Sequence, residues 1–304
     1  MEGLVSANWA GPGRPRVNVT VGDLEWWIAN LGPGADLAAR IQLWFLEGEL
    51  VGWGWLSPRA ELHWLVSDGL PLEEKRIRDA ILAWHADRAP KMQTPDGPPT
   101  VLGASGADGW AEAAHLVSRG WNATDELFTE YHQPLDLDLD PPRVPEGYVL
   151  RTMAGPEDIP ARVEVHRAAF APSRMTVEKY ELLVRQPHYA FDRDVVIAAP
   201  DGSFAAFAMC WTDPLAEIGE FEPVGVHPDH QRRGLGRVVM RQGLRLMRAA
   251  GMRDAIVFSL RTNVASEALY RSAGFDELAL HRIYRKPLPT ETAGSASPPP
   301  TIEP

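Results

Sequence analysis

The chain has 304 residues, 45% apolar and 23% charged, which is a globular composition long enough for one large domain or two ordinary ones. No apolar run approaches the roughly 20 residues of a membrane-spanning helix, and the N-terminus lacks the basic start and apolar core of a signal peptide. The single cysteine, Cys210, excludes an internal disulfide and fits a reducing compartment. We therefore expect a soluble, cytoplasmic protein that does not bind membranes.

The formal net charge of −11 is unevenly distributed along the chain. Residues 1–146 contain 22 acids and 11 bases, whereas residues 147–288 contain 17 acids and 19 bases. The acidic first half would repel the phosphates of a nucleic acid, so we expect no nucleic-acid partner. The second half is the part suited to an anionic ligand.

In the first half, the apolar pattern predicts a hairpin, a strand, a helix, a strand, a helix and a strand. These elements are expected at residues 40–58, 60–69, 72–89, 100–105, 107–121 and 126–135. A proline-rich linker follows at 136–146.

The second half repeats this order more clearly. Its elements are expected at residues 148–153, 159–170, 177–185, 194–199, 204–211, 218–226, 236–251, 255–260, 263–275 and 278–288. The closing segments SRGWNATDELFTEYHQPL and SAGFDELALHRIYRKPL align with one inserted residue. We therefore predict an α/β (α+β) protein of two lobes related by duplication, at 1–135 and 147–288, and a disordered tail at 289–304.

The segment VGVHPDHQRRGLGRVVM, Val224–Met240, joins a strand to a helix through a glycine-bearing turn. The first N–H groups of a helix have no intrahelical partner, and the helix dipole is positive there, so such a turn favours anions. Gly234 and Gly236 lack a Cβ and let a diphosphate approach the backbone of Arg232–Arg237. The spacing matches neither a Walker loop nor G-x-G-x-x-G.

QRRGLG at 231–236 matches the pattern Q/R-x-x-G-x-G/A, and V-x-V-x-P precedes it at 224–228. NVASEALYRSAGF at 263–275 approximates N-x-x-A-x-x-[LF]-Y-x-x-x-G-F. With these motifs the second half resembles the GCN5-related N-acetyltransferase (GNAT) family. The first half resembles it only as a degenerate copy, so the chain looks like a tandem-GNAT protein, similar in layout to mycothiol synthases.

The resemblance implies that each lobe is a mixed, mostly antiparallel sheet flanked by helices. It also implies transfer of an acetyl group from acetyl-CoA to an amine by direct attack in a ternary complex. The cofactor-binding residues that it implies are Val224, Gly225 and Val226 for the pantetheine amides, Arg232, Arg233, Gly234, Leu235, Gly236 and Arg237 for the pyrophosphate, and Asn263 for the pantetheine arm.

The catalytic residues implied are Tyr270, Glu220 and Glu222. Tyr270 lies two helical turns after Asn263 and could protonate the departing thiolate. The two glutamates share a strand face, and Glu220 is favoured over Glu222 as the base that takes the proton of the amine. Pro223 between them predicts a bulged or splayed strand. Purely structural roles remain open: an N-cap for Asn263, a core position for Tyr270 and a surface face for the glutamates.

The first half lacks these features. Ser67–Pro71 is too short for the anion loop, and Glu73 and Glu74 would place negative charge where a diphosphate would lie. Leu116 replaces the tyrosine, and Gly109 replaces the asparagine. We therefore predict one active site, in the second lobe.

The sequence leaves the acceptor, the oligomeric state and one alternative function open. The amine acceptor could be a small molecule, a peptide or a protein, and the layout is compatible with a monomer. The alternative function is a non-catalytic acyl-CoA-binding or regulatory protein that kept the fold. His227 and His230 are too few for a metal site, so we expect no metal.

Overall fold

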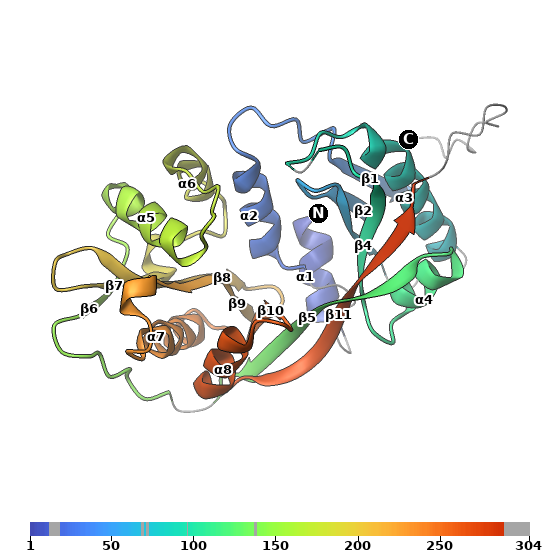
Figure 1. Cartoon of the computed structure of the whole chain (residues 1–304). Helices are drawn as coiled ribbons and strands as arrows, with labels where there is room; N and C mark the ends of the chain where they lie inside the picture. Colours follow the sequence, from blue (N-terminus) through green and yellow to red (C-terminus); the bar gives the residue numbers. More distant parts are fainter. Residues whose placement is uncertain (12–18, 68–69, 71–72, 96, 137–138, 289–304) are drawn as a thin grey trace. The chain divides into compact units, whose positions relative to one another are not determined.

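The computed structural model describes the chain except residues 12–18, 68–69, 71–72, 96, 137–138 and 289–304 (Figure 1). The tail predicted to be disordered and part of the predicted linker lie outside the described residues. The chain forms two compact units. Of the described residues, unit 1 comprises Met1 and those within 36–125 and 282–288, and unit 2 comprises those within 2–35 and 126–281.

Unit 1 contains a mixed sheet in which β1, β2 and β3 pair antiparallel and β3 pairs with β4 in parallel. Its strands are β1 (Ile41–Leu46), β2 (Glu49–Leu56), β3 (Glu61–Val66), β4 (Val101–Ala107) and the end of β11 (Asp276–Pro287); its helices are α3 (Glu74–Arg88), η1 (Ala89–Lys91) and α4 (Ala111–Ser118). The apolar faces of α3 and the sheet enclose a core that includes Leu62, Trp64 and Ile81. These elements confirm the predicted order.

Unit 2 contains a sheet in the order β5-β10-β9-β8-β7-β6, in which only β9 and β10 run parallel among the pairs between described residues. Its strands are β5 (Asn122–Pro134), β6 (Val149–Thr152), β7 (Asp194–Ala198), β8 (Phe204–Asp213), β9 (Ile218–Val226) and β10 (Asp254–Leu260). Its helices are α1 (Glu2–Ala10), α2 (Val21–Leu31), η2 (Pro156–Asp158), α5 (Ile159–Ala169), α6 (Val177–Leu183), η3 (Phe191–Arg193), η4 (Pro228–His230), α7 (Leu235–Ala249) and α8 (Val264–Ala273).

The strands of unit 2 alternate between two apolar cores, as a two-residue side-chain period requires. Val195 and Ile197 face the core that α7 covers, whereas Val196 faces the core beneath α5 and α6. Figure 1 shows α7 and α8 on one face of this sheet and α5 and α6 on the other. Both faces of the sheet are therefore covered by helices, as the sequence predicts.

Helices α1 and α2 were not predicted. Helix α2 packs against α6, β8 and β9. Its close approach to β8 depends on Gly22, since a Cβ at this position would lie 2.3 Å from Cγ of Trp211. Thr20 caps the helix: its hydroxyl accepts the N–H of Asp23, and the Asp23 carboxylate accepts the N–H of Thr20, each at 3.0 Å. The reciprocal capping box explains why the helix begins at Val21.

The closing strand of each predicted repeat packs in the unit of the other repeat. Residues 128–134 of β5 pair antiparallel with the whole of β10. The end of β11 lies in unit 1, where Tyr284 joins the core and Arg285 pairs with Glu61 at 2.6 Å. The boundaries 1–135 and 147–288 are predicted limits of the two sequence repeats and stay a prediction. The compact units are divided differently, because most of β5 belongs to unit 2 and the end of β11 belongs to unit 1.

The strand β9 is irregular at Pro223, as predicted. Its pairing with β8 shifts register between Ala208 and Cys210, opposite this proline. Its parallel ladder with β10 runs only from Ile218–Asp254 to Phe221–Val257, with no later pair of these strands among the described residues. The two strands therefore separate after Phe221.

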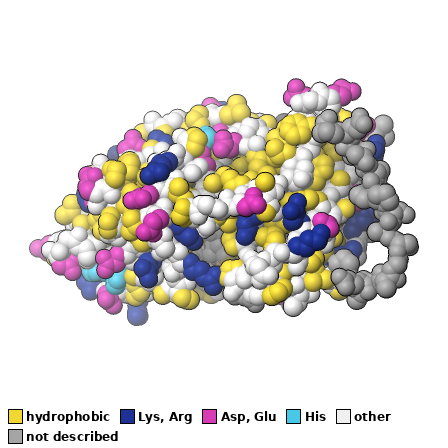
Figure 2. Space-filling view, turned by 90° about the horizontal axis from the view of Figure 1, so that it is seen from above, with side chains coloured by type: hydrophobic (Ala, Val, Ile, Leu, Met, Phe, Trp, Pro, Cys, Tyr) yellow, Lys and Arg dark blue, Asp and Glu magenta, His cyan; other side chains and the backbone are white. Residues whose placement is uncertain are grey.

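Acidic and basic side chains are interspersed with apolar ones over the face shown in Figure 2. Among the described residues, no helix is both long and apolar enough to cross a membrane.

Candidate active site

The predicted anion loop lies between η4 and α7. Gly234 occupies the N-cap position of α7 with φ 79° and ψ 3°, a left-handed conformation that favours glycine. A Cβ on Gly236 would lie 3.1 Å from the Leu269 side chain, so this glycine allows α7 and α8 to pack closely. Arg232, Arg233 and Arg237 are exposed around this helix start. The loop therefore combines free helical N–H groups with positive charge.

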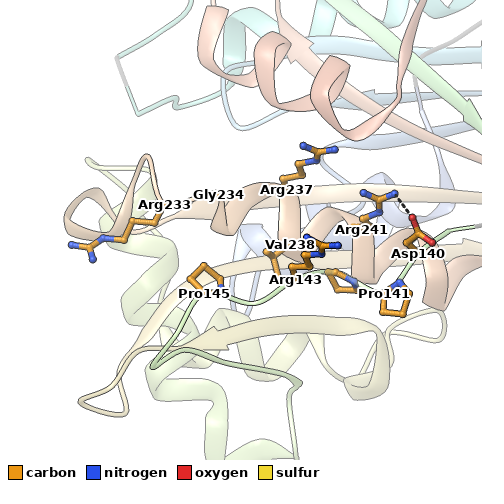
Figure 3. Close-up of a pocket in the computed structure, with 10 residues that line it drawn as sticks. Asp140, Pro141, Arg143, Pro145, Arg233, Gly234, Arg237, Val238 and Arg241 are labelled. Carbon is orange, nitrogen blue, oxygen red and sulfur yellow. Dashed lines mark ion pairs between the residues drawn. The ribbon is translucent and has the colours of Figure 1, made fainter.

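A cavity of about 780 Å³ opens beside this loop (Figure 3). It is lined by Asp140, Pro141, Pro142, Arg143, Pro145, Arg233, Gly234, Arg237, Val238 and Arg241. Four arginines and one carboxylate border it, and that carboxylate, of Asp140, lies 3.9 Å from the Arg241 guanidinium. The excess positive charge suits a phosphate-bearing ligand.

Two of these arginines, Arg143 and Arg241, were not predicted from the sequence. Arg241 is one turn beyond the motif on α7, where helical spacing from Arg237 could have revealed it. Arg143 lies in the predicted linker, whose composition carries no signal of a binding role.

The backbone of β9 is open on one side beyond Phe221. Val224, Gly225 and Val226 pair with β8, and among the described residues they have no ladder partner on the β10 side. The Gly225 Cα lies against Phe207, since a Cβ there would come within 2.4 Å of the ring. The unpaired edge offers N–H and C=O groups to an extended ligand. Leu235 is 1% exposed and belongs to the core, so it can offer only backbone to a ligand.

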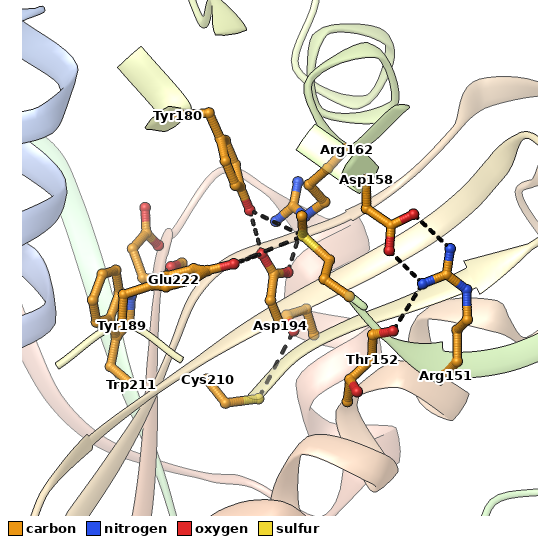
Figure 4. Close-up of polar contacts among 12 residues, drawn as sticks. Arg151, Thr152, Asp158, Arg162, Tyr180, Tyr189, Asp194, Cys210, Trp211 and Glu222 are labelled. Atoms are coloured by element: carbon orange, nitrogen blue, oxygen red, sulfur yellow. Dashed lines mark hydrogen bonds and ion pairs between the residues drawn. The ribbon is translucent and has the colours of Figure 1, made fainter. Parts of the chain in front are cut away.

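The two candidate bases differ in their surroundings. Glu220 is 2% exposed, and Thr20 donates its hydroxyl proton to the Oε2 of this residue. Its other oxygen, Oε1, is buried and has no hydrogen-bond partner among the described residues. Glu222 is half-buried, and its backbone oxygen accepts the Trp211 indole N–H at 2.7 Å (Figure 4). Glu222 is therefore the more accessible carboxyl.

Burial raises the pKa of three carboxyls here, and repulsion by Asp23 adds to the effect for two of them. Burial, and then the charge of Asp23, hold the pKa of Glu220 well above its usual range. The same two causes raise the pKa of Glu222 to about 8. Burial raises the pKa of Asp23 to about 7, although the hydrogen bonds from Thr20 lower it. This cluster thus holds protons near neutral pH.

Tyr270 is 6% exposed, and its ring meets the Tyr131 ring edge-on at 5.5 Å. Burial raises the pKa of its hydroxyl, and the charge of Glu222 adds to this. The structure thus brings the candidate acid within electrostatic reach of a candidate base. Asn263 caps α8 by accepting the Ser266 N–H at 3.2 Å, which confirms the capping interpretation.

A buried polar network beneath the site fixes β7 (Figure 4). Asp194 accepts hydrogen bonds from Arg162 Nε at 3.0 Å, from the Tyr180 hydroxyl, and from the Tyr189 hydroxyl at 3.2 Å. Cys210 is buried, and burial raises the pKa of its thiol, which agrees with an inert core cysteine. The hydrogen bonds of Asp194 therefore join β7 to α5 and α6.

One group of possible metal ligands occurs among the described residues: Glu2, Glu25 and His188 have ligand atoms within 4.8 Å of one another. Both oxygens of Glu25, however, already accept hydrogen bonds from His188. In unit 1, Leu116, which the sequence places at the position equivalent to Tyr270, is fully buried.

The sequence of the chain is similar to those of known acetyltransferases. A model of the "Acetyltransferase (GNAT) family" matches residues 162–275. Mycothiol acetyltransferases of Streptomyces coelicolor and Thermobispora bispora are 32% and 30% identical over 188 and 197 residues, or 58% and 60% of this chain. The first match spans only 60% of the relative's length and the second 67%. The mycothiol acetyltransferase of Nocardia farcinica is 29% identical over 81% of this chain and 82% of its own length.

Solved structures show the same fold over most of the chain. A GCN5-related N-acetyltransferase from Sphaerobacter thermophilus aligns with a TM-score of 0.66 and 18% identity, covering 94% of this chain and 91% of its own. A tandem GNAT protein from the clavulanic acid biosynthesis pathway aligns with a TM-score of 0.62 and 16% identity, covering 89% and 94%. With its tandem layout and its acetyltransferase relatives, the chain belongs to the GNAT family of acetyltransferases.

Proposed function

We propose that this protein transfers an acetyl group from acetyl-CoA to an amine of a small molecule, at one active site in unit 2. The observation that carries the proposal is the arrangement at β9 and α7, where an open strand edge leads directly into a left-handed glycine turn surrounded by arginines. A pantetheine arm and a diphosphate need these two features in this order. Relatives named mycothiol acetyltransferase favour a small-molecule acceptor over a protein.

In this proposal the residues divide into three groups by what they bind. The β9 edge at Val224–Val226 forms backbone hydrogen bonds with the pantetheine amides. Arg232–Arg237, with the free N–H groups of α7, binds the pyrophosphate. Asn263 mainly caps α8 and has the pantetheine arm as its second candidate partner.

The acceptor nitrogen must lose two protons, and the departing sulfur must gain one. The acceptor ammonium loses its first proton to a carboxylate, and its nitrogen lone pair then attacks the thioester carbonyl carbon. The C–S bond breaks to release the thiolate, and the second nitrogen proton replaces the proton that the thiolate takes up. Glu222 is the base that the geometry favours over Glu220, because it is accessible and its pKa lies near working pH. Tyr270 gives its proton, or a hydrogen bond, to the thiolate.

Calorimetric titration with acetyl-CoA tests the binding part. We expect one site in the wild type, at least tenfold weaker binding in Arg233→Glu/Arg237→Glu, and unchanged binding in the exposed control Arg185→Glu. Two sites would contradict the prediction that the first lobe is silent, and absence of binding would overturn the proposal.

Turnover separates this proposal from the acyl-CoA-binding alternative. With a panel of small amines and detection of the released thiol, we expect acetyl-CoA consumption that depends on the amine. Tyr270→Phe should lower kcat by roughly 10²–10⁴-fold while leaving acetyl-CoA binding intact. Binding without turnover of any amine would favour the alternative.

A further inference from the structure

Glu220, the less accessible of the two candidate carboxyls, is in contact with a residue that precedes it by 200 positions in the sequence. Thr20 is 3% exposed and Asp23 is 9% exposed, and both belong to unit 2 with Glu220. The Thr20 hydroxyl donates to Glu220 Oε2, while the capping box of α2 fixes the Thr20 side chain from the other side. The helix N-cap and the carboxyl thus share one hydroxyl group.

From this juxtaposition we propose that Thr20 and Asp23 complete the acid–base site of the second lobe, Thr20 by positioning Glu220 and Asp23 by setting the charge that Glu222 experiences. The inference rests on the proposed function, because it assigns these residues to the proton transfer of that reaction. Neither residue is part of the motifs that identify the family in this sequence.

The hydroxyl has one proton to donate, and its direction matters. Thr20 accepts the Asp23 N–H at 3.0 Å, and two carboxyl oxygens lie within reach of its own proton. Asp23 Oδ2 is 3.4 Å away and Glu220 Oε2 is closer, so Glu220 is the better placed acceptor of that one proton. Glu220 then has one fixed oxygen, while its buried Oε1 has no hydrogen-bond partner in the part of the chain that the structure describes. Burial raises the pKa of Glu220 and so favours its protonated form, which keeps negative charge away from Glu222, whereas the hydrogen bond from Thr20 lowers this pKa.

Few other charged groups act on Glu220 and Glu222 among the described residues. Glu130 on β5 acts on Glu220 but is itself paired with His281 on β11 at 2.8 Å. Tyr270 on α8 interacts with Glu222 and is neutral below its raised pKa. Thr20 bonds to both Asp23 on α2 and Glu220 on β9, and Glu222 follows Glu220 two residues later on the same strand. This placement brings the Asp23 charge to Glu222, and Asp23 is the group whose charge changes near neutral pH and raises the pKa of Glu222.

The test follows the carboxyls directly, so it does not require the acceptor. Side-chain carboxyl ¹³C NMR of protein labelled at glutamate gives the titration of Glu222, which Glu222→Gln identifies by loss of its signal. Asp23→Asn should lower the Glu222 midpoint by about one pH unit, because one neighbouring negative charge is removed. Thr20→Val should shift the Glu220 signal, and Thr20→Ser should restore it.

The matched control is Thr176, the N-cap of α6, whose side chain accepts the Lys179 N–H at 3.3 Å. Thr176→Val removes a helix cap of the same kind in the same unit and should leave the Glu220 and Glu222 signals in place. A merely structural role for Thr20 predicts that the two valine variants behave alike, and that result would overturn the inference.

The second measurement is the pH dependence of kcat/KM with an amine found in the turnover screen. Its acid limb should move in Asp23→Asn by the same amount as the Glu222 midpoint. If Asp23→Asn shifted the titration midpoint of Glu222 but not the acid limb of kcat/KM, the inference would be overturned and the proposed function would stand. Absence of turnover with every amine would overturn the proposed function, and this inference with it, whatever the NMR titration shows.

Discussion

Gly22→Ala tests whether α2 packs against β8 of unit 2 as described. The new Cβ would lie 2.3, 2.7 and 2.8 Å from Cγ, Cδ1 and Cβ of Trp211, which is 1% exposed and cannot rotate away. Overpacking of this kind typically costs about 1–3 kcal/mol, while replacing glycine by alanine in a helix returns up to about 1 kcal/mol. We therefore expect a net loss of about 1–2 kcal/mol in the free energy of unfolding.

Gly3→Ala is the matched control, because a Cβ on Gly3 in α1 would meet nothing within 4 Å. Urea denaturation followed by circular dichroism should show a lower midpoint for Gly22→Ala and an unchanged or slightly higher midpoint for Gly3→Ala. Displacement of α2 also moves Thr20 from Glu220, so Gly22→Ala should perturb the Glu220 carboxyl signal. Equal stability of the two variants, with that signal unmoved, would refute the packing argument.

Three further predictions concern the stability of unit 2, its pH dependence and its need for the first half of the chain. Asp194→Asn should cost about 3–5 kcal/mol in urea denaturation, because it leaves the fully buried Arg162 charge without its carboxylate; Asp158→Asn, in a more exposed pair, should cost about 1 kcal/mol or less. Burial raises the pKa of Asp23 from 3.8 to about 7, so the folded chain binds more protons than the unfolded one between these values. Stability should therefore fall as pH rises through this window, and Asp23→Asn should flatten that fall. A fragment of residues 136–304 should fail to bind acetyl-CoA, as calorimetry would show.

The elements after residue 40 could be predicted because their apolar patterns have the two-residue or helical period that one buried face imposes. The strand β9 even shows its irregularity in the sequence, since Pro223 cannot donate to a ladder. The helices α1 and α2 were missed because their signals are weak. Helix α2 contains Gly22 and apolar residues on most sides, and its capping box uses aspartate where glutamate or glutamine is typical.

The site could be predicted only where its residues are close in sequence. The anion loop lies within one strand–turn–helix segment, so its glycines and arginines were found together. Thr20 meets Glu220 across 200 positions of sequence, and Arg143 reaches the cavity from a linker. No local period or motif links such pairs. The choice between Glu220 and Glu222 likewise depends on how deeply each side chain is buried. The sequence does not show this difference, because the two residues are expected on the same face of one strand.

The first half of the chain contributes to the structure of unit 2, whether or not it binds acetyl-CoA. Unit 2 takes α2 and most of β5 from it, and seven residue pairs join β5 to β10. Without them β10 would become an open edge strand, prone to pairing with other chains, and Tyr131 would leave the core that contains Tyr270. Loss of α2 would also uncover Trp211 and remove the hydroxyl that holds Glu220. Selection on the second lobe therefore acts on the first, and the two repeats cannot be separated at the linker without dismantling the site.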